Sequence, residues 1–304
     1  MHIFEIKEGR RTKLVPSKKY GIHLARFTHH PREILYASTK IDDSLRLLEL
    51  HNESYVRYFA GHTSSVTCVA LSPGNDGFLS CGADDTVCLW DVKSRNPTGK
   101  LKLSTPYLAA YDPSANVMAI ASQSTSSILL YDIRNFDKAP FSTFDMLECE
   151  EAFTPTTRRP AWTRLEFSND GKSVLLCTDS QGHFLLDAFE GKTKAFLTGK
   201  SGSTGRAAPL SVSGKPLGQG DACFSQDARH VIGGSGGGHP DLLIWDAHKV
   251  ADGPAEHLQP SSRLLSKGIR AAVIECNPRY NMLATADTKV CMWLPGQEGK
   301  DIER

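Results

Sequence analysis

The chain has 304 residues, of which 40% are hydrophobic and 23% charged, and these values are typical of a globular protein with a sizeable core. Its 35 lysines and arginines nearly balance 34 aspartates and glutamates, and the resulting net charge of +1 excludes a global field that attracts nucleic acid or anionic lipid. The sequence has no apolar run of about 18 residues and no signal-peptide pattern at its start, so we expect neither a membrane span nor secretion.

The first predicted elements are two strands, at residues 3–6 and 11–15. They resemble the two outer strands of a four-stranded unit whose inner strands are missing. The last unit ends at Trp293-Leu294-Pro295 and has no recognisable outer strand after it. Rings of such units usually close by pairing the two termini within one sheet. We therefore expect an N-terminally shortened chain or gene model that leaves residues 1–16 as a partial unit.

A unit at about 17–60 follows, and then the clearest repeat of the chain, at 61–102. That repeat begins with Gly61-His62 and continues through strands that end at Ser72-Pro73 and Ser80, the turn residue Asp84, and a strand that ends at Trp90-Asp91. This order is the signature of a WD repeat. When the other segments are aligned on Trp90, the equivalent strand ends are Phe4, Leu48, Tyr131, Leu186, Trp245 and Trp293. The first three intervals are 44, 42 and 41 residues, close to the 40–45 residues of one blade.

Further blades are predicted at 103–144, 160–198, 217–258 and 264–295, with insertions at 145–160 and 199–220. An apolar strand followed by a turn recurs in each blade, and runs bounded by Pro, Asn, Asp and Gly are strand and hairpin signals. We therefore predict an all-β, WD-repeat β-propeller of the seven-bladed type with an incomplete first blade, as a single domain over 1–304.

Neither a metal nor a cofactor is expected. The eight cysteines, at positions 68, 81, 88, 149, 177, 223, 276 and 291, form no C-x-x-C pair, which favours buried reduced thiols over disulfides or zinc. The eleven histidines have no metal-binding spacing such as H-E-x-x-H. The three Gly-Lys-Ser/Thr triplets lack the earlier glycine of a phosphate-binding loop.

Four residues of the clearest repeat, His62, Ser80, Asp84 and Trp90, include the residue types of a hydrolase triad. In a WD blade, however, these positions form a hydrogen-bond network from the loop before the inner strand to the Trp of the third strand. Such buried polar groups must be paired, at about 1–3 kcal/mol for each group left unpaired. No G-x-S-x-G nucleophile motif is present. We therefore interpret the four residues as structural and predict that the protein is not an enzyme.

Candidate partner-binding residues are expected in loops that emerge on one rim of the propeller. Aromatic residues and arginine are enriched at interface centres, and basic side chains can accept phosphorylated or acidic motifs. The alternative for each residue is a solvated loop face. The candidates are Lys18, Lys19, Tyr20, Lys40, Asp42, Asp43, Tyr107, Arg158, Arg159, Trp162, Lys267 and Arg270.

Several stretches outside the generic repeat signature resemble one WD-repeat family. They are Ser17-Lys18-Lys19-Tyr20-Gly21, Lys40-Ile41-Asp42-Asp43, Tyr55-Val56-Arg57-Tyr58-Phe59, the segment from Tyr131 to Phe141, the segment from Trp162 to Lys172, Asp187-Ala188-Phe189-Glu190-Gly191 and Trp293-Leu294-Pro295. The sequence is similar to the WD-repeat subunit shared by COMPASS, the histone H3 lysine-4 methyltransferase complex, and the mRNA cleavage and polyadenylation factor. The similarity covers nearly the whole chain.

This resemblance implies a nuclear, non-catalytic scaffold with several partners. They are the methyltransferase catalytic subunit and other COMPASS subunits, the cleavage and polyadenylation factor subunits, and the phosphorylated C-terminal domain of RNA polymerase II, with a role in transcription termination. The resemblance also implies seven blades, with an N-terminal strand that completes the last one, whereas this chain begins inside the first. The alternative is another WD-repeat adaptor, such as a ubiquitin-ligase substrate receptor. A propeller enzyme ranks third, because no nucleophile–base pair or metal set is present.

Overall fold

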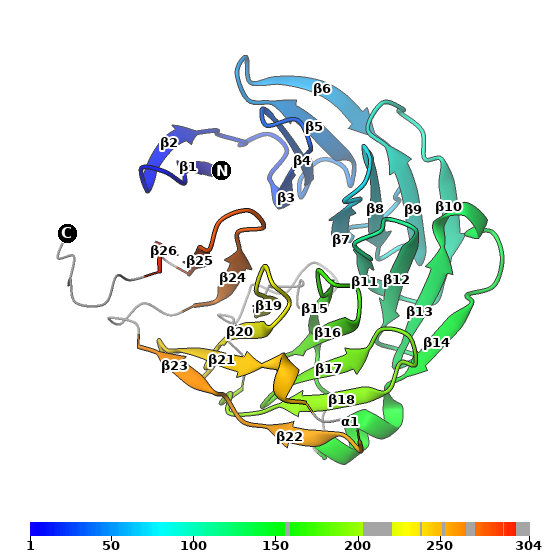
Figure 1. The fold of residues 1–304 in the computed structure, drawn as a ribbon. Helices are drawn as coiled ribbons and strands as arrows, with labels where there is room; N and C mark the ends of the chain where they lie inside the picture. Colours follow the sequence, from blue (N-terminus) through cyan, green and yellow to red (C-terminus); the bar gives the residue numbers. More distant parts are fainter. Residues whose placement is uncertain are drawn as a thin grey trace. The chain divides into compact units, whose positions relative to one another are not determined.

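The computed structural model describes residues 1–155, 159–202, 221–237, 239–250, 253–265, 271–287 and 289–295. The chain divides into two compact units, Met1–Glu151 and Ala152–Arg304, and each is described by itself. Within the described ranges, the regular structure is almost all β-strand (Figure 1). The exceptions there are one α-helix, α1 (Leu147–Phe153), and two short 3-10 helices, η1 (Ile133–Asn135) and η2 (Ala247–Lys249). None of the described helices is long and apolar enough to cross a membrane.

The first unit begins with a hairpin of β1 (His2–Glu5) and β2 (Arg10–Leu14), which pair only with each other. Its ends are joined because the Met1 amino group donates to the Val15 carbonyl oxygen at 2.8 Å. The Val15 side chain is buried with Tyr36 and Leu48 of the following sheet. The hairpin is therefore packed against that sheet through apolar side chains, not through strand pairing.

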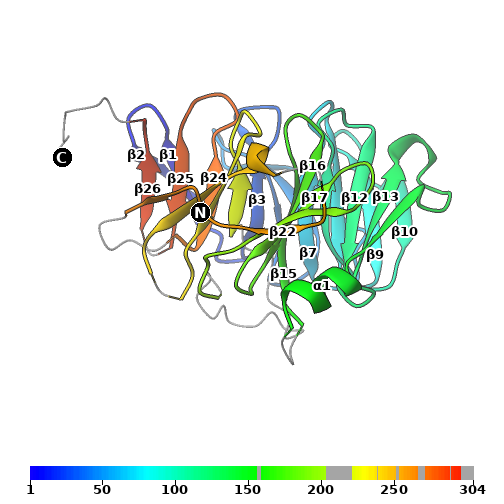
Figure 2. The ribbon, with the colours of Figure 1, turned by 60° about the horizontal axis from the view of Figure 1, so that its bottom comes forward.

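Three four-stranded antiparallel sheets follow in the first unit (Figure 2). Within each sheet, the strands lie side by side in chain order. Their strands are β3 (His23–Phe27), β4 (Glu33–Ala37), β5 (Leu45–Glu49) and β6 (Ser54–Phe59); β7 (Val66–Leu71), β8 (Gly77–Gly82), β9 (Thr86–Asp91) and β10 (Gly99–Lys102); and β11 (Pro106–Tyr111), β12 (Val117–Ser122), β13 (Ser127–Asp132) and β14 (Ser142–Asp145). Aspartate and asparagine side chains hold many of the turns. Asp112, for example, accepts a hydrogen bond from the Val117 amide at 2.8 Å.

Apolar side chains fill the space between neighbouring sheets of the first unit. Between the sheets of β3–β6 and β7–β10, Phe78 stacks on Trp90 with ring centres 5.8 Å apart, and Phe59 meets both rings edge-on. Between the sheets of β7–β10 and β11–β14, Leu79 and Ile120 belong to a second buried cluster. The sheet of β7–β10 therefore buries both faces, which explains the nearly continuous apolar runs of its strands.

The second unit contains three sheets. They are formed by β15 (Trp162–Phe167), β16 (Ser173–Thr178), β17 (His183–Asp187), β18 (Thr193–Leu197) and β22 (Glu256–Leu258); β19 (Ala222–Phe224), β20 (His230–Gly234), β21 (Leu242–Asp246) and β23 (Ser262–Leu264); and β24 (Val273–Cys276), β25 (Leu283–Ala286) and β26 (Val290–Trp293). Apolar clusters centred on Trp245 and on Ile274 fill the two spaces between adjacent sheets.

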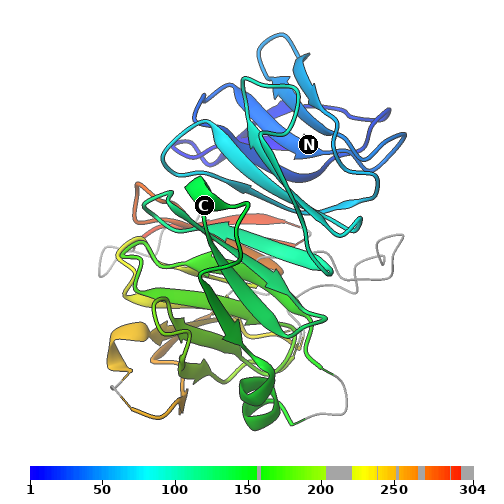
Figure 3. The same cartoon turned by 90° about the vertical axis from the view of Figure 1, so that its right-hand side faces the viewer.

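The strand β22 departs from the simple repeat. It leaves its own sheet and pairs in parallel with β18, so that the sheet begun by β15 has five strands (Figure 1). The chain then returns, and β23 becomes the fourth strand beside β21. The range predicted for this blade, 217–258, thus includes β22 but ends before β23. Within the predicted insertion at 145–160, α1 follows β14 (Figure 3).

The predicted number of seven blades needs correction. The described residues form six sheets of three to five strands and one two-stranded hairpin. The physical reason is that β1 and β2 bond only to each other and not to a longer sheet. The described part of the chain therefore contains six blade-like sheets.

Candidate functional site

Arg46 is the centre of a polar and aromatic cluster at one end of the sheet of β3–β6. Its side chain is only 2% exposed, although it carries a guanidinium group. The Nε atom donates to Ser38 Oγ at 2.6 Å, and Nη2 lies 2.7 Å from both carboxylate oxygens of Asp42. A buried charge is tolerated when it is paired and hydrogen-bonded in this way.

Tyrosine rings surround the same guanidinium group. Its central carbon lies 3.6 Å from the ring centre of Tyr20, 4.8 Å from that of Tyr58 and 5.9 Å from that of Tyr55. Tyr55 also shares a 2.9 Å hydrogen bond with the Tyr36 hydroxyl. Cation–π contacts of this kind contribute on the order of 1 kcal/mol each. The cluster therefore holds Tyr20 and Tyr58 in fixed positions.

Backbone hydrogen bonds join the two loops that carry the predicted rim residues 18–20 and 40–43. The carbonyl oxygen of Tyr20 accepts from the amides of Thr39 and Lys40, at 3.0 and 2.9 Å. Gly21 has a φ of +68°, and a Cβ there would lie 1.9 Å from Thr39 Oγ1, so the close approach of the loops requires glycine. Ile41 has a positive φ of 73° and is 73% exposed, so its apolar side chain projects into solvent.

We call this set of exposed and partly exposed residues the Arg46 surface. It presents basic, acidic and apolar groups around the buried arginine, and Lys19 Nζ lies 4.9 Å from the Tyr20 ring centre. Its members are Lys18, Lys19, Tyr20, Lys40, Ile41, Asp42, Asp43 and Tyr58. Partial burial, followed by the negative charges of Asp42 and Asp84, raises the pKa of Asp43. Six of the twelve rim candidates thus lie together on rigidly held loops.

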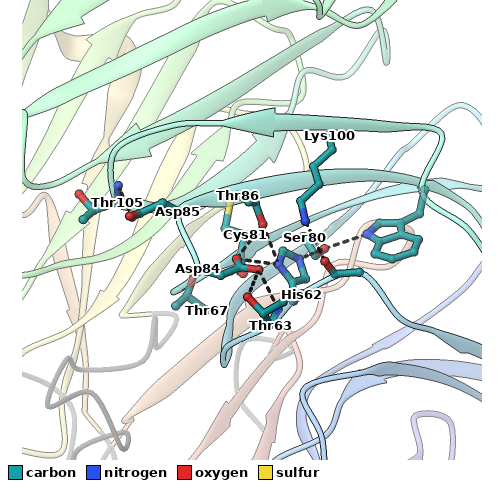
Figure 4. A network of polar contacts seen from close by, with 12 residues as sticks. His62, Thr63, Thr67, Ser80, Cys81, Asp84, Asp85, Thr86, Lys100 and Thr105 are labelled. Atoms are coloured by element: carbon teal, nitrogen blue, oxygen red, sulfur yellow. Dashed lines mark hydrogen bonds and ion pairs between the residues drawn. The ribbon is translucent and has the colours of Figure 1, made fainter.

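The four residues predicted as a structural network form a continuous chain of contacts (Figure 4). The Nε2 atom of His62 lies 2.7 Å from Ser80 Oγ, and Trp90 Nε1 donates to that same Oγ at 2.8 Å. On its other side, His62 Nδ1 lies 3.0 Å from Asp84 Oδ1. Because Ser80 is fully buried, its hydroxyl cannot reach a substrate. This arrangement joins the loop before β7 to strands β8 and β9 and to the turn between them.

Asp84 is the anionic end of this network. Burial alone would raise its pKa, but hydrogen bonds from Thr86 Oγ1 at 2.7 Å and from the Thr63 amide at 2.8 Å outweigh burial, with help from His62. Together they lower its pKa to about 2. Asp84 is therefore held as a carboxylate at neutral pH.

The other rim candidates are not part of the Arg46 surface. Tyr107, in β11, and Trp162, in β15, have buried side chains. Neither ring is presented to a partner. Arg159 is exposed in the second unit, and Arg158, Lys267 and Arg270 lie outside the described residues.

A second buried polar cluster, in the second unit, was not anticipated from the sequence. Lys200 Nζ donates to the Thr178 carbonyl oxygen and lies 3.8 Å from Asp221 Oδ2. His183 Nδ1 accepts from the Thr178 amide at 3.1 Å, and burial, followed by the charge of Lys200, places the pKa of His183 well below its usual value. Among the described residues, no group of three or more His, Cys, Asp and Glu side chains could hold a metal ion.

Sequence reasoning also missed Arg46 and Tyr58. A usable signal was present, because Arg46 stands among the three leucines of the strand Leu45–Glu49, with Ser38 and Asp42 nearby as partners. An arginine in a buried strand needs such partners. The position of Arg46 in the sequence could thus have indicated the centre of the Arg46 surface.

Comparison with known proteins identifies the family. Residues 53–91 match the family described as WD domain, G-beta repeat. The chain is 37% identical over 299 residues to WD repeat-containing protein 82 of Drosophila melanogaster, covering 97% of this chain and 84% of that protein. It is 31% identical to Set1 complex component swd2 of Schizosaccharomyces pombe, covering 96% and 86%, and 31% identical to COMPASS component SWD2 of Saccharomyces cerevisiae, covering 95% and 83%. The chain belongs to the Swd2 family.

Membership of the Swd2 family confirms the resemblance drawn from the sequence motifs, as well as the all-β, WD-repeat β-propeller class. The matched repeat, 53–91, spans β6 to β9 and contains all four residues of the His62 network. In this Swd2-family chain, the repeat that matches the family model therefore also contains the complete His62 network.

Proposed function

We propose that this chain is a non-catalytic scaffold subunit of a COMPASS-type histone H3 lysine-4 methyltransferase complex. The observation that carries the proposal is the similarity to proteins named as Set1 complex and COMPASS components, which extends over 95–96% of this chain. Such coverage leaves little of the chain for an added catalytic domain. The His62 network supports a structural role for its Ser, His and Asp residues, because the serine hydroxyl is buried.

The Arg46 surface is the proposed docking site for a peptide segment of another subunit. Three exposed lysines, Lys18, Lys19 and Lys40, supply positive charge for acidic or phosphorylated side chains. The exposed Ile41 and the half-exposed Tyr58 supply apolar contact area. Because hydrogen bonds already hold both loops, binding loses less entropy than it would on free loops.

The wider proposal follows the family resemblance. It places the protein in the nucleus and adds the cleavage and polyadenylation factor, transcription termination and the phosphorylated C-terminal domain of RNA polymerase II. In that proposal, Arg158, Arg159, Lys267 and Arg270 supply further basic contacts.

The test is affinity purification of the tagged full chain from nuclear extract, followed by mass spectrometry. A Lys18→Glu/Lys40→Glu variant reverses two charges on the Arg46 surface. Its matched control, Lys93→Glu/Arg95→Glu, reverses two exposed charges in the β9–β10 loop. Asp84, whose charge acts on Asp43 of the Arg46 surface, lies in the β8–β9 turn. The β9–β10 loop is at the other end of that antiparallel sheet, so the control charges lie away from the Arg46 surface.

We expect the wild-type and control chains to recover methyltransferase-complex subunits, and the Lys18→Glu/Lys40→Glu variant to recover at least tenfold less. Equal recovery by both variants would remove the Arg46 surface from the proposal. Recovery of ubiquitin-ligase subunits in place of methyltransferase subunits by the wild-type chain would overturn the scaffold function itself.

A further inference from the structure

Two cysteines from neighbouring sheets of the second unit lie in direct contact. Cys223 belongs to β19 and Cys276 ends β24, and 53 residues separate them in the sequence. The Cys223 thiol donates a hydrogen bond to Cys276 Sγ, and the two sulfur atoms are 3.3 Å apart. A disulfide bond requires about 2.05 Å, so a side-chain movement of about 1 Å would bring the two atoms to bonding distance.

The two thiols differ in their access to solvent. Cys223 is 1% exposed and lies among Leu242, Ile274 and Leu283. Cys276 is partly exposed and lines a pocket of about 310 Å³, together with Tyr280 and other residues of this unit. A small oxidant can therefore approach Cys276 from the pocket, whereas the Cys223 thiol is buried behind the surface.

We propose that Cys223 and Cys276 form an oxidisable dithiol, which hydrogen peroxide converts into a disulfide that joins the sheet of β19 to the sheet of β24. Cys276 is the attacking thiol and Cys223 the resolving one. The product is a covalent bridge between two sheets that otherwise meet through side-chain packing.

The reaction balances in two steps. The Cys276 thiolate attacks one peroxide oxygen, the O–O bond breaks, and the departing hydroxide takes up a proton to become water, leaving Cys276 as a sulfenic acid. The Cys223 sulfur then attacks the Cys276 sulfur, the S–O bond breaks, and the hydroxide leaves with the Cys223 proton as a second water. Two thiols are oxidised, and one peroxide is reduced to two waters.

The electrostatic surroundings agree with these roles. The hydrogen bond from Cys223 lowers the pKa of Cys276, with a further contribution from the nearby Arg164 guanidinium, while burial and the carboxylates of Glu166 and Glu275 oppose them. Donation of that same hydrogen bond, together with burial, raises the pKa of Cys223. Arg164 is itself held close by, because its Nη1 donates to the Ile274 carbonyl oxygen at 3.1 Å.

The experiment treats the full, reduced chain with hydrogen peroxide, blocks the remaining thiols with iodoacetamide and digests the protein with trypsin without reduction. Mass spectrometry should detect peptide 207–229, which contains Cys223, linked to peptide 271–279, which contains Cys276. The intact chain should lose two of its eight free thiols and recover them with dithiothreitol. The total tryptophan fluorescence provides a second readout and should fall, because Trp293 lines the same pocket and a nearby disulfide quenches tryptophan.

Three variants separate the roles of the thiols. Cys223→Ser should stop at a sulfenic acid on Cys276 that a dimedone probe labels, whereas Cys276→Ser should leave Cys223 reduced. Cys291→Ser removes a partly exposed thiol on β26 of the same sheet and should form the linked peptides as the wild type does. The wild-type readout needs no variant to fold. Absence of the linked peptides while other thiols are oxidised, or a link from Cys276 to Cys291 instead, would overturn the proposal.

Discussion

Asp84 is a single side chain whose ionisation links the His62 network to the stability of the first unit. Its carboxylate accepts hydrogen bonds from His62, Thr63 and Thr86, and its pKa of about 2 lies below the ordinary 3.8. A group with a depressed pKa stabilises the folded state at pH values above its unfolded pKa, and that stabilisation disappears as the pH falls through the folded pKa. Asp84 should therefore contribute about 2 kcal/mol at pH 7, a contribution lost between about pH 4 and pH 2.

We predict that Asp84→Asn lowers the free energy of unfolding of the first unit by about 2 kcal/mol at neutral pH. Urea unfolding followed by tryptophan fluorescence at a series of pH values would measure it. The difference from wild type should shrink as the pH falls from 4 towards 2. Asp137→Asn, which changes an exposed carboxylate of the same unit, should have little effect. A deficit that stays constant over this pH range would show that the charge of Asp84 is not the source.

Among the elements, β22 is the one whose position depends most on contacts that are distant in sequence. It adds to the edge of β18, and Phe153 at the end of α1 covers the pair. The Phe153 ring stacks on Phe196 at 5.4 Å and meets the His257 ring edge-on at 5.2 Å. Helix α1, the outer strand β18 and the added strand β22 thus share one small cluster of rings.

We predict that Phe153→Ala loosens β22 while leaving the inner strands intact. Loss of a half-buried phenylalanine should cost about 2 kcal/mol, less than the 3–5 kcal/mol of a fully buried one. Hydrogen exchange measured by mass spectrometry should become faster for the peptide that contains residues 256–258. Phe189→Ala is the matched control, because that ring is 76% exposed; similar exchange in the two variants would contradict the proposed role of Phe153.

The elements that were predictable are those coded by local pattern. The aligned strand-end residues Leu48, Trp90, Tyr131, Leu186, Trp245 and Trp293 lie in β5, β9, β13, β17, β21 and β26, the third strands of their sheets. Short apolar runs bounded by turn-forming Asp, Asn or Gly residues specify such strands over a few positions. The pairing of β22 with β18 depends on partners 61 residues apart, as at Ala195 and Glu256, and no local pattern records it.

The candidate site was predictable only in part, for a related reason. The sequence marked the exposed loop residues Lys18, Lys19, Lys40 and Asp42, because charge and turn patterns are local. It did not reveal Arg46 as their common anchor, since the Tyr20 and Tyr58 rings reach that side chain from different elements. For Tyr107, residue type suggested an interface, but the side chain is buried in β11, and residue type alone does not predict burial.

At the scale of the whole molecule, the near-balance of charge sets the expected behaviour toward nucleic acid. With 35 basic and 34 acidic residues, the chain lacks the excess positive charge that drives counterion release from DNA or RNA. We predict no mobility shift of a 30-base-pair duplex at about 10 µM protein in about 0.15 M salt, a concentration at which many non-specific binders do bind. A shift that weakens steeply with added salt would contradict this expectation.

The path of β22 also has a consequence for how the protein is made. Leu197 completes β18, but its partner Leu258 in β22 follows 61 residues later. At translation rates of about 5–20 residues per second, that interval is roughly 3–12 seconds. During this time the emerging chain presents the outer edge of β18 unpaired, and unpaired edges are templates for association between chains. For several seconds, the nascent chain therefore carries a sheet with an unpaired edge. A chaperone can protect this edge, and another nascent chain can pair with it.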